Sequence, residues 1–334
     1  MVDAAMQRLE QYVTHAWYRG ARWLWLLWPF SLLTSVVVSR RRRQFLLHPP
    51  TPLSVPVVVV GGITVGGSGK TPVVLALIKE LQARGRRIGV VSRGYGGAQS
   101  NEPREVSDST PATLVGDEPV LITRTTSVPV VVCRDRRRAA ERLISEHDLD
   151  VILSDDGLQH YQLPRTFEIA IVDGSRGLGN GRLLPMGPLR EPPSRLSEVD
   201  FVLERNSEDA QRRVSYQPTG FRHHATGQYM AIDQAVDMWV TQNVVAITGL
   251  GQPGQFFDLL RTLGLTFTTQ ALRDHRPISS VTLKATEGQI VVITSKDAVK
   301  LSSESDARIW ILEIEAVVPD SLIEGVMAAI DSKG

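Results

Sequence analysis

The stretch Thr64-Val65-Gly66-Gly67-Ser68-Gly69-Lys70-Thr71-Pro72 constrains the fold of this chain more than any other feature. It follows an apolar run at residues 55–60 and precedes a helix-like apolar segment at residues 73–78. A strand, a glycine-rich loop and a helix N-terminus in succession form a cradle for a nucleotide phosphate, because glycines let backbone N–H groups approach the anion closely. In such a cradle Lys70 reaches the outer phosphates and the Thr71 hydroxyl is a Mg²⁺ ligand.

We therefore expect a nucleotide to bind at Thr64, Val65, Gly66, Gly67, Ser68, Gly69, Lys70 and Thr71. The strict pattern has glycine at the position that Thr64 occupies here. An ordinary glycine-rich turn between a strand and a helix is the alternative interpretation.

Short apolar runs follow the loop and alternate with helix-like segments. They lie at residues 88–91, 128–133, 151–153, 169–172 and 201–203. Nearly continuous apolar strands are typical of a parallel sheet that is covered on both faces. We therefore expect an α/β fold, with a P-loop NTPase-like, doubly wound and mainly parallel sheet that binds ligands at the carboxyl ends of its strands.

The length of 334 residues allows two domains. Residues 206–240 are polar and irregular, and helix–strand alternation resumes after them. The predicted organisation is an N-terminal membrane-contacting helical segment at residues 1–45, a phosphate-loop core domain at 46–215, a linker at 216–240 and a smaller α/β domain at 241–334.

The composition argues against some classes of function. With 22% charged residues and a net charge of +1, the chain has no overall basic field for nucleic acid. The single cysteine, Cys133, cannot form an internal disulfide and suits a reducing cytoplasm. Because it ends an apolar run, we expect it to be a small buried side chain.

The N-terminal segment combines tryptophan, leucine and arginine. Four of the six tryptophans lie at residues 17–28, and residues 23–38 carry no charge before Arg40-Arg41-Arg42-Arg43. As a helix, residues 23–38 would extend roughly 24 Å, short of the roughly 30 Å hydrocarbon core of a bilayer. Aromatic and arginine side chains suit the headgroup boundary, which favours an amphipathic helix in the membrane plane. A buried core helix and a true membrane span are the alternatives.

Two adjacent carboxylates end one predicted strand, in Val151-Ile152-Leu153-Ser154-Asp155-Asp156. In a nucleotide-binding sheet, an acid at the tip of a neighbouring strand holds the Mg²⁺ that bridges the phosphates. Such a pair alone is often a turn or a helix cap. Together with the glycine loop it predicts a metal site of Thr71, Asp155 and Asp156, and it leaves open which aspartate contacts the metal.

Further polar clusters stand near predicted strand ends. Gly116-Asp117-Glu118-Pro119 opens a helical pattern, so Asp117 is either a helix cap or a base that takes a proton from an attacking hydroxyl. Arg136-Arg137-Arg138 is either a solvated helix face or, beside a phosphate site, an anion-binding group. Asp274-His275-Arg276 places a histidine beside a carboxylate, either for structure or for catalysis.

Two motifs suggest other nucleotides. Gly249-Leu250-Gly251-Gln252-Pro253-Gly254 matches a dinucleotide-binding pattern, but Pro253 stiffens the turn and no acid follows at the expected strand end. Ser295-Lys296-Asp297-Ala298 is similar to a guanine-reading loop, but its aspartate comes one position early. We therefore expect neither NAD(P) binding nor GTP specificity.

Taken in order, the motifs resemble one family, the tetraacyldisaccharide 4′-kinases, which are lipid A kinases of Gram-negative bacteria. The resemblance covers roughly residues 15–300. It is carried by the glycine loop with its Thr64 start, Ser92-Arg93-Gly94-Tyr95-Gly96-Gly97, Gly116-Asp117-Glu118-Pro119, Asp155-Asp156-Gly157-Leu158-Gln159-His160, Gly187-Pro188-Leu189-Arg190-Glu191, Asp274-His275 and Thr294-Ser295-Lys296-Asp297-Ala298-Val299-Lys300. The family carries threonine at the Thr64 position too. Gly62 and Arg276 depart from its usual asparagine and histidine.

The resemblance implies ATP and Mg²⁺ as cofactors and transfer of the γ-phosphate to the 4′-hydroxyl of a membrane-bound tetraacyldisaccharide 1-phosphate, at the cytoplasmic face of the inner membrane. It implies Asp117 as the base, His275 as its helper and Lys70 on the transferred phosphate. It also implies nucleotide or substrate contacts from Tyr95, Arg136, His160, Arg190 and Glu191.

Because the base and its helper would lie on separate domains, we expect the two domains to close over ATP. This closure would complete the site and exclude water. The alternative function is a membrane-tethered P-loop ATPase or GTPase switch, which would hydrolyse its nucleotide without a lipid acceptor.

Overall fold

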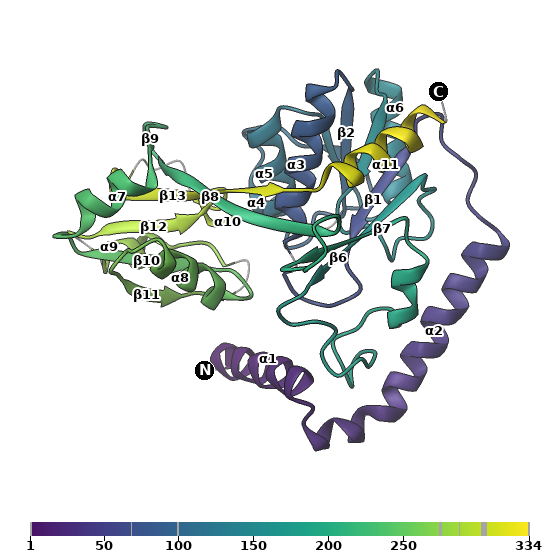
Figure 1. Cartoon of the computed structure of the whole chain (residues 1–334), viewed down its shortest axis with the longest axis horizontal. Coiled ribbons are helices and arrows are strands. Elements are labelled where there is room, and N and C mark those ends of the chain that lie inside the picture. Colours follow the sequence, from purple (N-terminus) through teal and green to yellow (C-terminus); the bar gives the residue numbers. More distant parts are fainter. Residues whose placement is uncertain are drawn as a thin grey trace.

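The computed structural model describes residues 2–67, 69–98, 100–273, 276–286, 288–301 and 306–332. Two lobes lie side by side, and two long strands, β8 (Arg213–His223) and β13 (Ile309–Val317), run between them (Figure 1). We call these two the bridging strands. The core lobe holds the glycine loop, and the smaller lobe holds most of the elements that follow β8.

Within the described residues, thirteen strands form one sheet in the order β11-β10-β12-β13-β8-β7-β6-β1-β5-β2-β4-β3, with β9 paired to β8. The remaining strands are β1 (Val57–Gly61), β2 (Ile88–Ser92), β3 (Arg104–Glu105), β4 (Val130–Val132), β5 (Val151–Ser154), β6 (Phe167–Asp173), β7 (Phe201–Arg205), β9 (Tyr229–Met230), β10 (Val244–Thr248), β11 (Thr268–Ala271) and β12 (Ile290–Thr294). The pairs β3–β4, β8–β9 and β8–β13 are antiparallel, and the others are parallel. The predicted mainly parallel α/β sheet is confirmed.

Helices cover the sheet and form an N-terminal arm. They are α1 (Val2–Arg19), α2 (Trp28–Leu47), α3 (Lys70–Ala83), α4 (Ala112–Val115), α5 (Asp117–Thr126), α6 (Arg136–Glu146), α7 (Ile232–Trp239), α8 (Pro253–Thr262), α9 (Ser280–Lys284), α10 (Ser295–Ala298) and α11 (Asp320–Asp331), with 3-10 helices η1 (Arg22–Leu27) and η2 (Pro193–Ser197).

Strand β1 shows why the core sheet is covered on both faces. Successive side chains of a strand point to opposite faces. Val58 and Val60 pack in the apolar core that includes α3, α5 and α11, whereas Val57 and Val59 pack in the core that includes α6. A run of valines is therefore buried on both sides, and the predicted double winding follows. Cys133 is buried in the second of these cores, as expected.

The predicted domain limits stay a prediction, but the structure places two segments differently from them. Residues 216–240, expected as a linker, form most of β8 together with β9 and α7. Helix α11, expected in the smaller domain, packs on the core lobe through Leu322, Ile323 and Val326 (Figure 1). The reason is the antiparallel pairing of β13 with β8, which returns the chain to the core lobe before its last helix.

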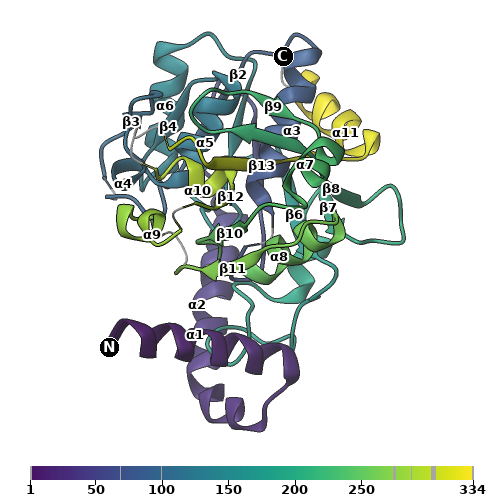
Figure 2. The same cartoon turned by 90° about the vertical axis from the view of Figure 1, so that its left-hand side faces the viewer.

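The segments α1, η1 and α2 form an arm at the foot of the molecule, away from α11 (Figure 2). Ser31 Oγ donates to the Leu183 carbonyl at 2.9 Å, Arg42 pairs with Glu198 at 2.8 Å, and the Phe45 and Tyr161 ring centroids lie 5.3 Å apart. The exposed large apolar side chains of the arm include Trp25, Leu26, Trp28, Phe30, Leu32, Leu33, Val36, Val37, Leu46 and Leu47.

The exposure of these side chains excludes one of the three sequence interpretations of the arm. Among the described helices, the segment Arg22–Leu47 is long and apolar enough to cross a membrane by length and composition, and only 11% of its most apolar window is buried. The interpretation as a buried core helix is therefore wrong.

Candidate active site

The pairing of β1 with β5 brings the glycine loop beside two carboxylates. The two strands are parallel, with Val59 opposite Ser154, so their carboxyl ends meet at one edge of the sheet. The loop follows β1, and Asp155-Asp156 follow β5. Lys70 Nζ lies 3.6 Å from Asp156 Oδ1. The expected proximity of the aspartates to the loop is confirmed, and their metal-binding role stays a prediction.

Neighbouring segments hold the N-terminal part of the glycine loop. Thr64 pairs with Leu189 in an isolated antiparallel bridge, and the Val65 N–H donates to the Pro188 carbonyl at 2.9 Å. Thr64 therefore occupies a paired and buried position at which the conformational freedom of glycine is not needed. The departure from the strict phosphate-loop pattern has this structural explanation.

The C-terminal part of the glycine loop does need glycine. Gly69 has φ 74°, in the left-handed region that favours glycine. A Cβ atom on Gly69 would also lie 2.3 Å from the Tyr216 hydroxyl oxygen. Ser68, between these two parts of the loop, lies outside the described residues.

Asp156 is the centre of an ion-pair cluster. Arg190 Nη1 donates to Asp156 Oδ2 at 2.9 Å, and Lys70 lies on the same carboxylate. Burial raises the pKa of Asp156, but Lys70 and Arg190 oppose it and lower the pKa to about 2. Its φ of 47° lies in the left-handed region, which aspartate tolerates better than most residues. Asp156 is therefore ionised throughout the physiological range.

Asp155 has the opposite electrostatic character. It is 2% exposed, and its Oδ1 has no hydrogen-bond partner in the described part of the chain. Burial raises the pKa of Asp155 to about 7, and the charges of Glu118 and Asp156 add to this effect. An unpartnered carboxylate oxygen next to a second carboxylate is the donor chemistry that Mg²⁺ prefers. With Thr71 on the same cleft, the expected metal residues fit the ion.

The expected base lies where the two lobes meet. Asp117 is the first residue of α5 and is buried. Lys296 Nζ and Lys300 Nζ, both from the smaller lobe, lie 3.8 and 3.9 Å from Asp117 Oδ2. Lys296 also pairs with Glu118 at 3.0 Å. The expected helper His275 lies outside the described residues.

Arg136 and His160 hold the turn that carries the two aspartates. Arg136 Nη2 donates to the backbone carbonyls of Asp155 at 3.2 Å and Asp156 at 2.9 Å. His160 Nε2 accepts the Arg136 backbone N–H at 3.2 Å. Burial and the Arg136 charge lower the pKa of His160 to about 4, so this ring is neutral at pH 7. Both residues also line the cleft described below.

The remaining expected contact residues divide into two groups. Tyr95 and Arg190 line the cleft. Glu191 lies behind the cleft wall: it is 1% exposed and accepts hydrogen bonds from Gln159 at 2.7 Å, Tyr161 at 2.6 Å and Arg195 at 3.2 Å. Its visible role is to hold Gln159, whose Oε1 accepts from Arg190 at 3.3 Å, rather than to contact a ligand directly.

Two residues for which the sequence suggested no role contact the glycine loop. Gln252 Nε2 donates to the Gly67 carbonyl at 3.3 Å, and the Tyr216 hydroxyl donates to the Gly69 carbonyl at 3.1 Å. Gln252 belongs to the motif that resembled a dinucleotide-binding loop. In the structure this motif contributes a contact to the glycine loop.

The motif that resembled a guanine-reading loop is structural in this fold. Asp297 is fully buried and accepts hydrogen bonds from the hydroxyls of Thr248 and Thr294, both at 2.7 Å. It also accepts the Gly249 N–H at 3.0 Å and pairs with Lys300 at 2.9 Å. Asp297 thereby ties the ends of β10 and β12 together.

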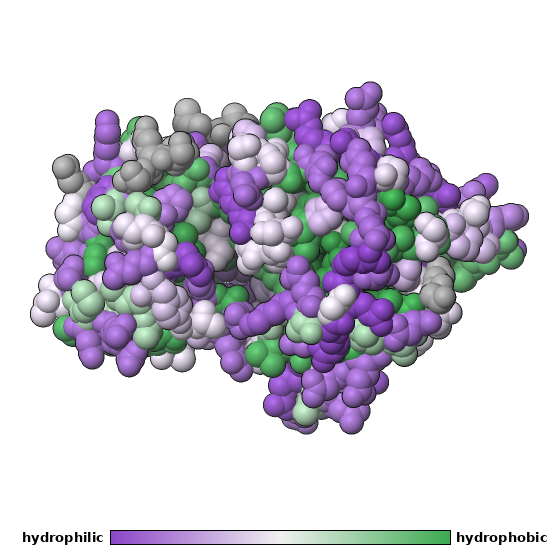
Figure 3. Space-filling model, turned by 90° about the horizontal axis from the view of Figure 1, so that it is seen from above, coloured by the Kyte–Doolittle hydropathy of each residue, from purple (hydrophilic) through white to green (hydrophobic). Residues whose placement is uncertain are grey.

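A cleft of about 1680 Å³ lies between the lobes and extends to α2. Figure 3, which views the molecule from above, shows the surface hollowed between the lobes. The cleft is lined by the described residues of the glycine loop, the Asp155-Asp156 turn, residues 250–252 of the smaller lobe, and Arg41 and Phe45 of α2. It exceeds the roughly 300–1,000 Å³ typical of a small-molecule pocket.

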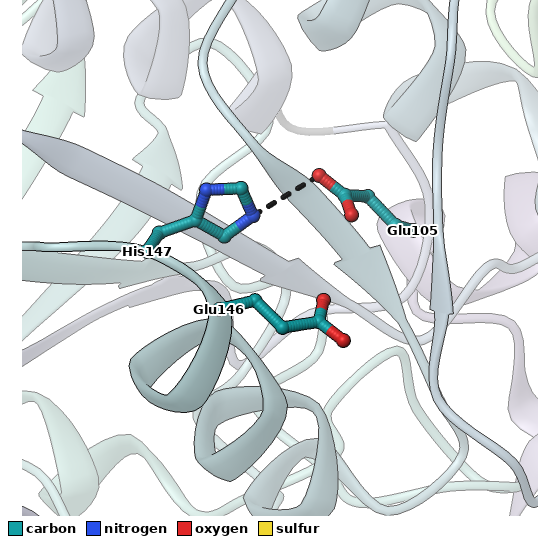
Figure 4. A group of neighbouring side chains, drawn as sticks. All are labelled: Glu105, Glu146 and His147. Atoms are coloured by element: carbon teal, nitrogen blue, oxygen red, sulfur yellow. Dashed lines mark hydrogen bonds and ion pairs between the residues drawn. The ribbon is translucent and has the colours of Figure 1, made fainter.

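A second group of potential metal ligands lies on the surface of the core lobe (Figure 4). The ligand atoms of Glu105, Glu146 and His147 lie within 4.8 Å of one another. His147 contacts Glu105 at 3.1 Å, and Glu146 pairs with Arg142 at 3.0 Å. Since the group is largely exposed and its charges already have partners, we assign no metal to it.

Comparison with known proteins identifies the family. Residues 23–331 match the family model of the Tetraacyldisaccharide-1-P 4'-kinase, LpxK. The chain is 43% identical to the tetraacyldisaccharide 4'-kinase of Alcanivorax borkumensis, over 96% of this chain and 98% of that protein. It is 46% identical to that of Stutzerimonas stutzeri, over 90% and 91% of the two chains.

A solved structure agrees with these matches. The crystal structure of LpxK from Aquifex aeolicus in complex with ATP has a TM-score of 0.78 and 26% identity, and the match covers 92% of this chain and 99% of that one. The family model and the relatives both span nearly the whole chain. This chain therefore belongs to the tetraacyldisaccharide 4′-kinase family.

Proposed function

We propose that this protein is a lipid kinase that transfers the γ-phosphate of ATP to the 4′-hydroxyl of the tetraacyldisaccharide 1-phosphate precursor of lipid A. The observation that carries the proposal is one cleft that is lined by the glycine loop, by the Asp155-Asp156 pair and, beside Asp117, by Glu118 and Lys296 of the lobe interface, and that reaches the N-terminal arm. Family membership supports the same activity.

The donor half of the site consists of the glycine loop and the residues at its edge. Backbone N–H groups at the start of α3 bind phosphate oxygens, and Lys70, 3.6 Å from Asp156, reaches the outer phosphates when it exchanges this carboxylate for them. Asp155, Asp156 and Thr71 would hold Mg²⁺, which when bound neutralises phosphate charge. Arg190 keeps Asp156 ionised and in place.

The acceptor half depends on the relative position of the lobes. Asp117 accepts the proton of the attacking 4′-hydroxyl, with His275 as the proposed helper. Since Lys296 and Lys300 reach Asp117 from the smaller lobe, a change in lobe position also changes the surroundings of the base. Closure of the cleft then couples nucleotide binding to proton removal and excludes water.

The arm supplies the membrane contact. Its exposed apolar side chains and the Arg40-Arg41-Arg42-Arg43 run suit a helix lying at the headgroup boundary of the cytoplasmic leaflet. Arg41 and Phe45 of α2 line the same cleft as the glycine loop. A lipid acceptor can therefore reach the phosphate donor while its acyl chains stay near the membrane.

Transfer of label from γ-³²P-ATP to the tetraacyldisaccharide 1-phosphate, resolved by thin-layer chromatography, tests the proposal. The expected result is labelled lipid that appears only with Mg²⁺ and the disaccharide present. The alternative, a membrane-tethered ATPase or GTPase switch, predicts free labelled phosphate at the same rate with and without lipid. That outcome would refute the kinase.

A further inference from the structure

Two carbonyls of the glycine loop are held by side chains that do not belong to the loop. Tyr216, on the bridging strand β8, donates to the Gly69 carbonyl at 3.1 Å. Gln252, just before α8 of the smaller lobe, donates to the Gly67 carbonyl at 3.3 Å. The two bonds act at either end of the turn that would surround a phosphate.

The bond from Tyr216 determines the direction of a phosphate-binding amide. In a trans peptide the carbonyl and the following N–H point in opposite directions in one plane. Holding the Gly69 carbonyl on Tyr216 therefore directs the Lys70 N–H away from Tyr216. Lys70 is the first residue of α3, and the N–H groups at a helix start have no partner within the helix. They are the donors that bind an anion.

Packing keeps Tyr216 in this position. A Cβ on Gly69 would collide with its hydroxyl, so the ring end lies directly against the loop backbone. The Arg205 guanidinium lies 5.4 Å from the centroid of the Tyr216 ring. Burial raises the pKa of Tyr216, which keeps the hydroxyl protonated as a donor.

The two bonds belong to one network. Arg205 Nη1 donates to Gln255 Oε1 at 2.7 Å, and Gln255 Nε2 donates to Gln252 Oε1 at 2.7 Å and to Asp173 Oδ2 at 3.3 Å. Arg205 therefore lies over the Tyr216 ring and is linked to Gln252 through Gln255. A movement of the smaller lobe that shifts Gln252 acts on the same network that holds Tyr216.

We propose that Tyr216 and Gln252 are positioning residues that orient the peptide groups of the glycine loop for the outer phosphates and link the loop to the position of the smaller lobe. The inference rests on the proposed function, because it assumes that the loop binds ATP. Neither side chain needs to touch the nucleotide for this role.

The test compares the affinities of the full-length protein in detergent for Mg·ATP and for AMP, by calorimetry. Tyr216→Phe removes the hydroxyl donor, and Tyr229→Phe is its control, because the Tyr229 hydroxyl donates to the Thr219 carbonyl away from the loop. Gln252→Met removes the amide donor, and Gln242→Met is its control, because Gln242 donates to the Met238 carbonyl at 3.1 Å.

Each loop variant is expected to raise the Kd for Mg·ATP about 3- to 10-fold, the range of one net hydrogen bond, and to leave the Kd for AMP, which lacks the outer phosphates, within 2-fold. The controls should leave both unchanged. The double variant should raise the Kd for Mg·ATP by less than the product of the two single-variant increases, since the two bonds share a network.

Two results would overturn the inference and leave the function intact. One is wild-type affinity for Mg·ATP in both loop variants. The other is an equal loss for Mg·ATP and AMP, which would indicate a general structural effect. Wild-type protein that binds neither nucleotide would instead refute the proposed function and the inference with it.

Discussion

Replacing Asp155 by asparagine should stabilise the metal-free protein at alkaline pH, even though Asp155 is a proposed metal ligand. Burial, with the charges of Glu118 and Asp156, raises the pKa of Asp155 to about 7. The folded state therefore holds this proton more tightly than the unfolded state, in which the pKa is about 3.9. The contribution of Asp155 to the unfolding free energy consequently falls as the pH rises from about 4 to about 7.

The size of the effect follows from the two pKa values. A difference of about 3 between folded and unfolded pKa corresponds to about 4 kcal/mol once the pH exceeds both values. At pH 5, where Asp155 is still protonated in the folded protein, the loss is about 1 to 2 kcal/mol. Asparagine has the shape of the protonated acid and does not titrate. Asp155→Asn should therefore be more stable than wild type, and the difference should be larger at pH 8 than at pH 5.

Urea denaturation at pH 5, 6, 7 and 8 with EDTA measures the difference, and Asp156→Asn is the matched control. Arg190 and Lys70 lower the pKa of Asp156 to about 2 against the effect of burial. Asp156→Asn should therefore destabilise the protein at every pH in this range, and by somewhat less at pH 8 than at pH 5, because the Asp156 charge also helps to raise the pKa of Asp155. Adding Mg²⁺ at 100 times its Kd should stabilise wild type by about 3 kcal/mol at pH 8 and Asp155→Asn by much less.

The opposite pattern would refute the reasoning. If Asp155→Asn destabilised the metal-free protein equally at pH 5 and pH 8, Asp155 would be an ordinary ionised carboxylate with partners, and the argument for metal binding from its unpartnered oxygen would fail.

Three further predictions concern the other parts of the site. Burial and Arg136 lower the pKa of His160 to about 4, below its ordinary 6.5, so the contribution of His160 to stability should fall by about 3 kcal/mol as the pH falls from 6.5 to 4, opposite in sign to the contribution of Asp155. The stability of wild type relative to His160→Gln, measured by denaturation, should fall by this amount, and a pH-independent difference between the two proteins would exclude His160 as its source. Asp117→Asn should lower kcat, measured by label transfer, by about 10²- to 10⁴-fold, and should leave the Kd for Mg·ATP, measured by calorimetry, within 2-fold of wild type. An unchanged kcat would exclude Asp117 as the base. Deletion of residues 1–47 should move the protein from the membrane to the soluble fraction after sedimentation, whereas persistent membrane binding would place the contact elsewhere.

Local sequence patterns predicted much of the core lobe. The valines of β1 are buried on both faces because β-branched apolar residues without polar alternation suit a doubly covered strand. The aspartates after β5 lie beside the glycine loop because parallel strands that pair end at the same edge. The burial of the valines follows from residues that are adjacent in sequence, whereas the meeting of the aspartates with the loop also required β1 and β5 to pair.

The packing of some segments could not be seen from the sequence pattern, because it depends on partners that are distant in the chain. Residues 216–240 look polar and irregular because β8 is only partly buried as it passes between the lobes. Helix α11 looks like part of the smaller domain because its apolar face does not reveal which core it packs against. The resemblance implied a ligand contact for Glu191, and its motif does not show the three donors that surround its carboxylate in the structure.

The sequence alone determined that the chain has a glycine-rich loop between a strand and a helix, an acidic strand end and an apolar N-terminal arm, because each is a run of neighbouring residues with one chemistry. Only the tertiary structure decided how the loop is held. The Tyr216 hydroxyl reaches Gly69 across 147 residues, and the Gln252 amide reaches Gly67 across 185 residues. Contacts over such separations exist only after the sheet has set the register of β8 and the position of the smaller lobe. For the same reason, the pKa values of Asp155 and Asp156 differ although the two residues are adjacent: burial decides the first, and Lys70 and Arg190 decide the second.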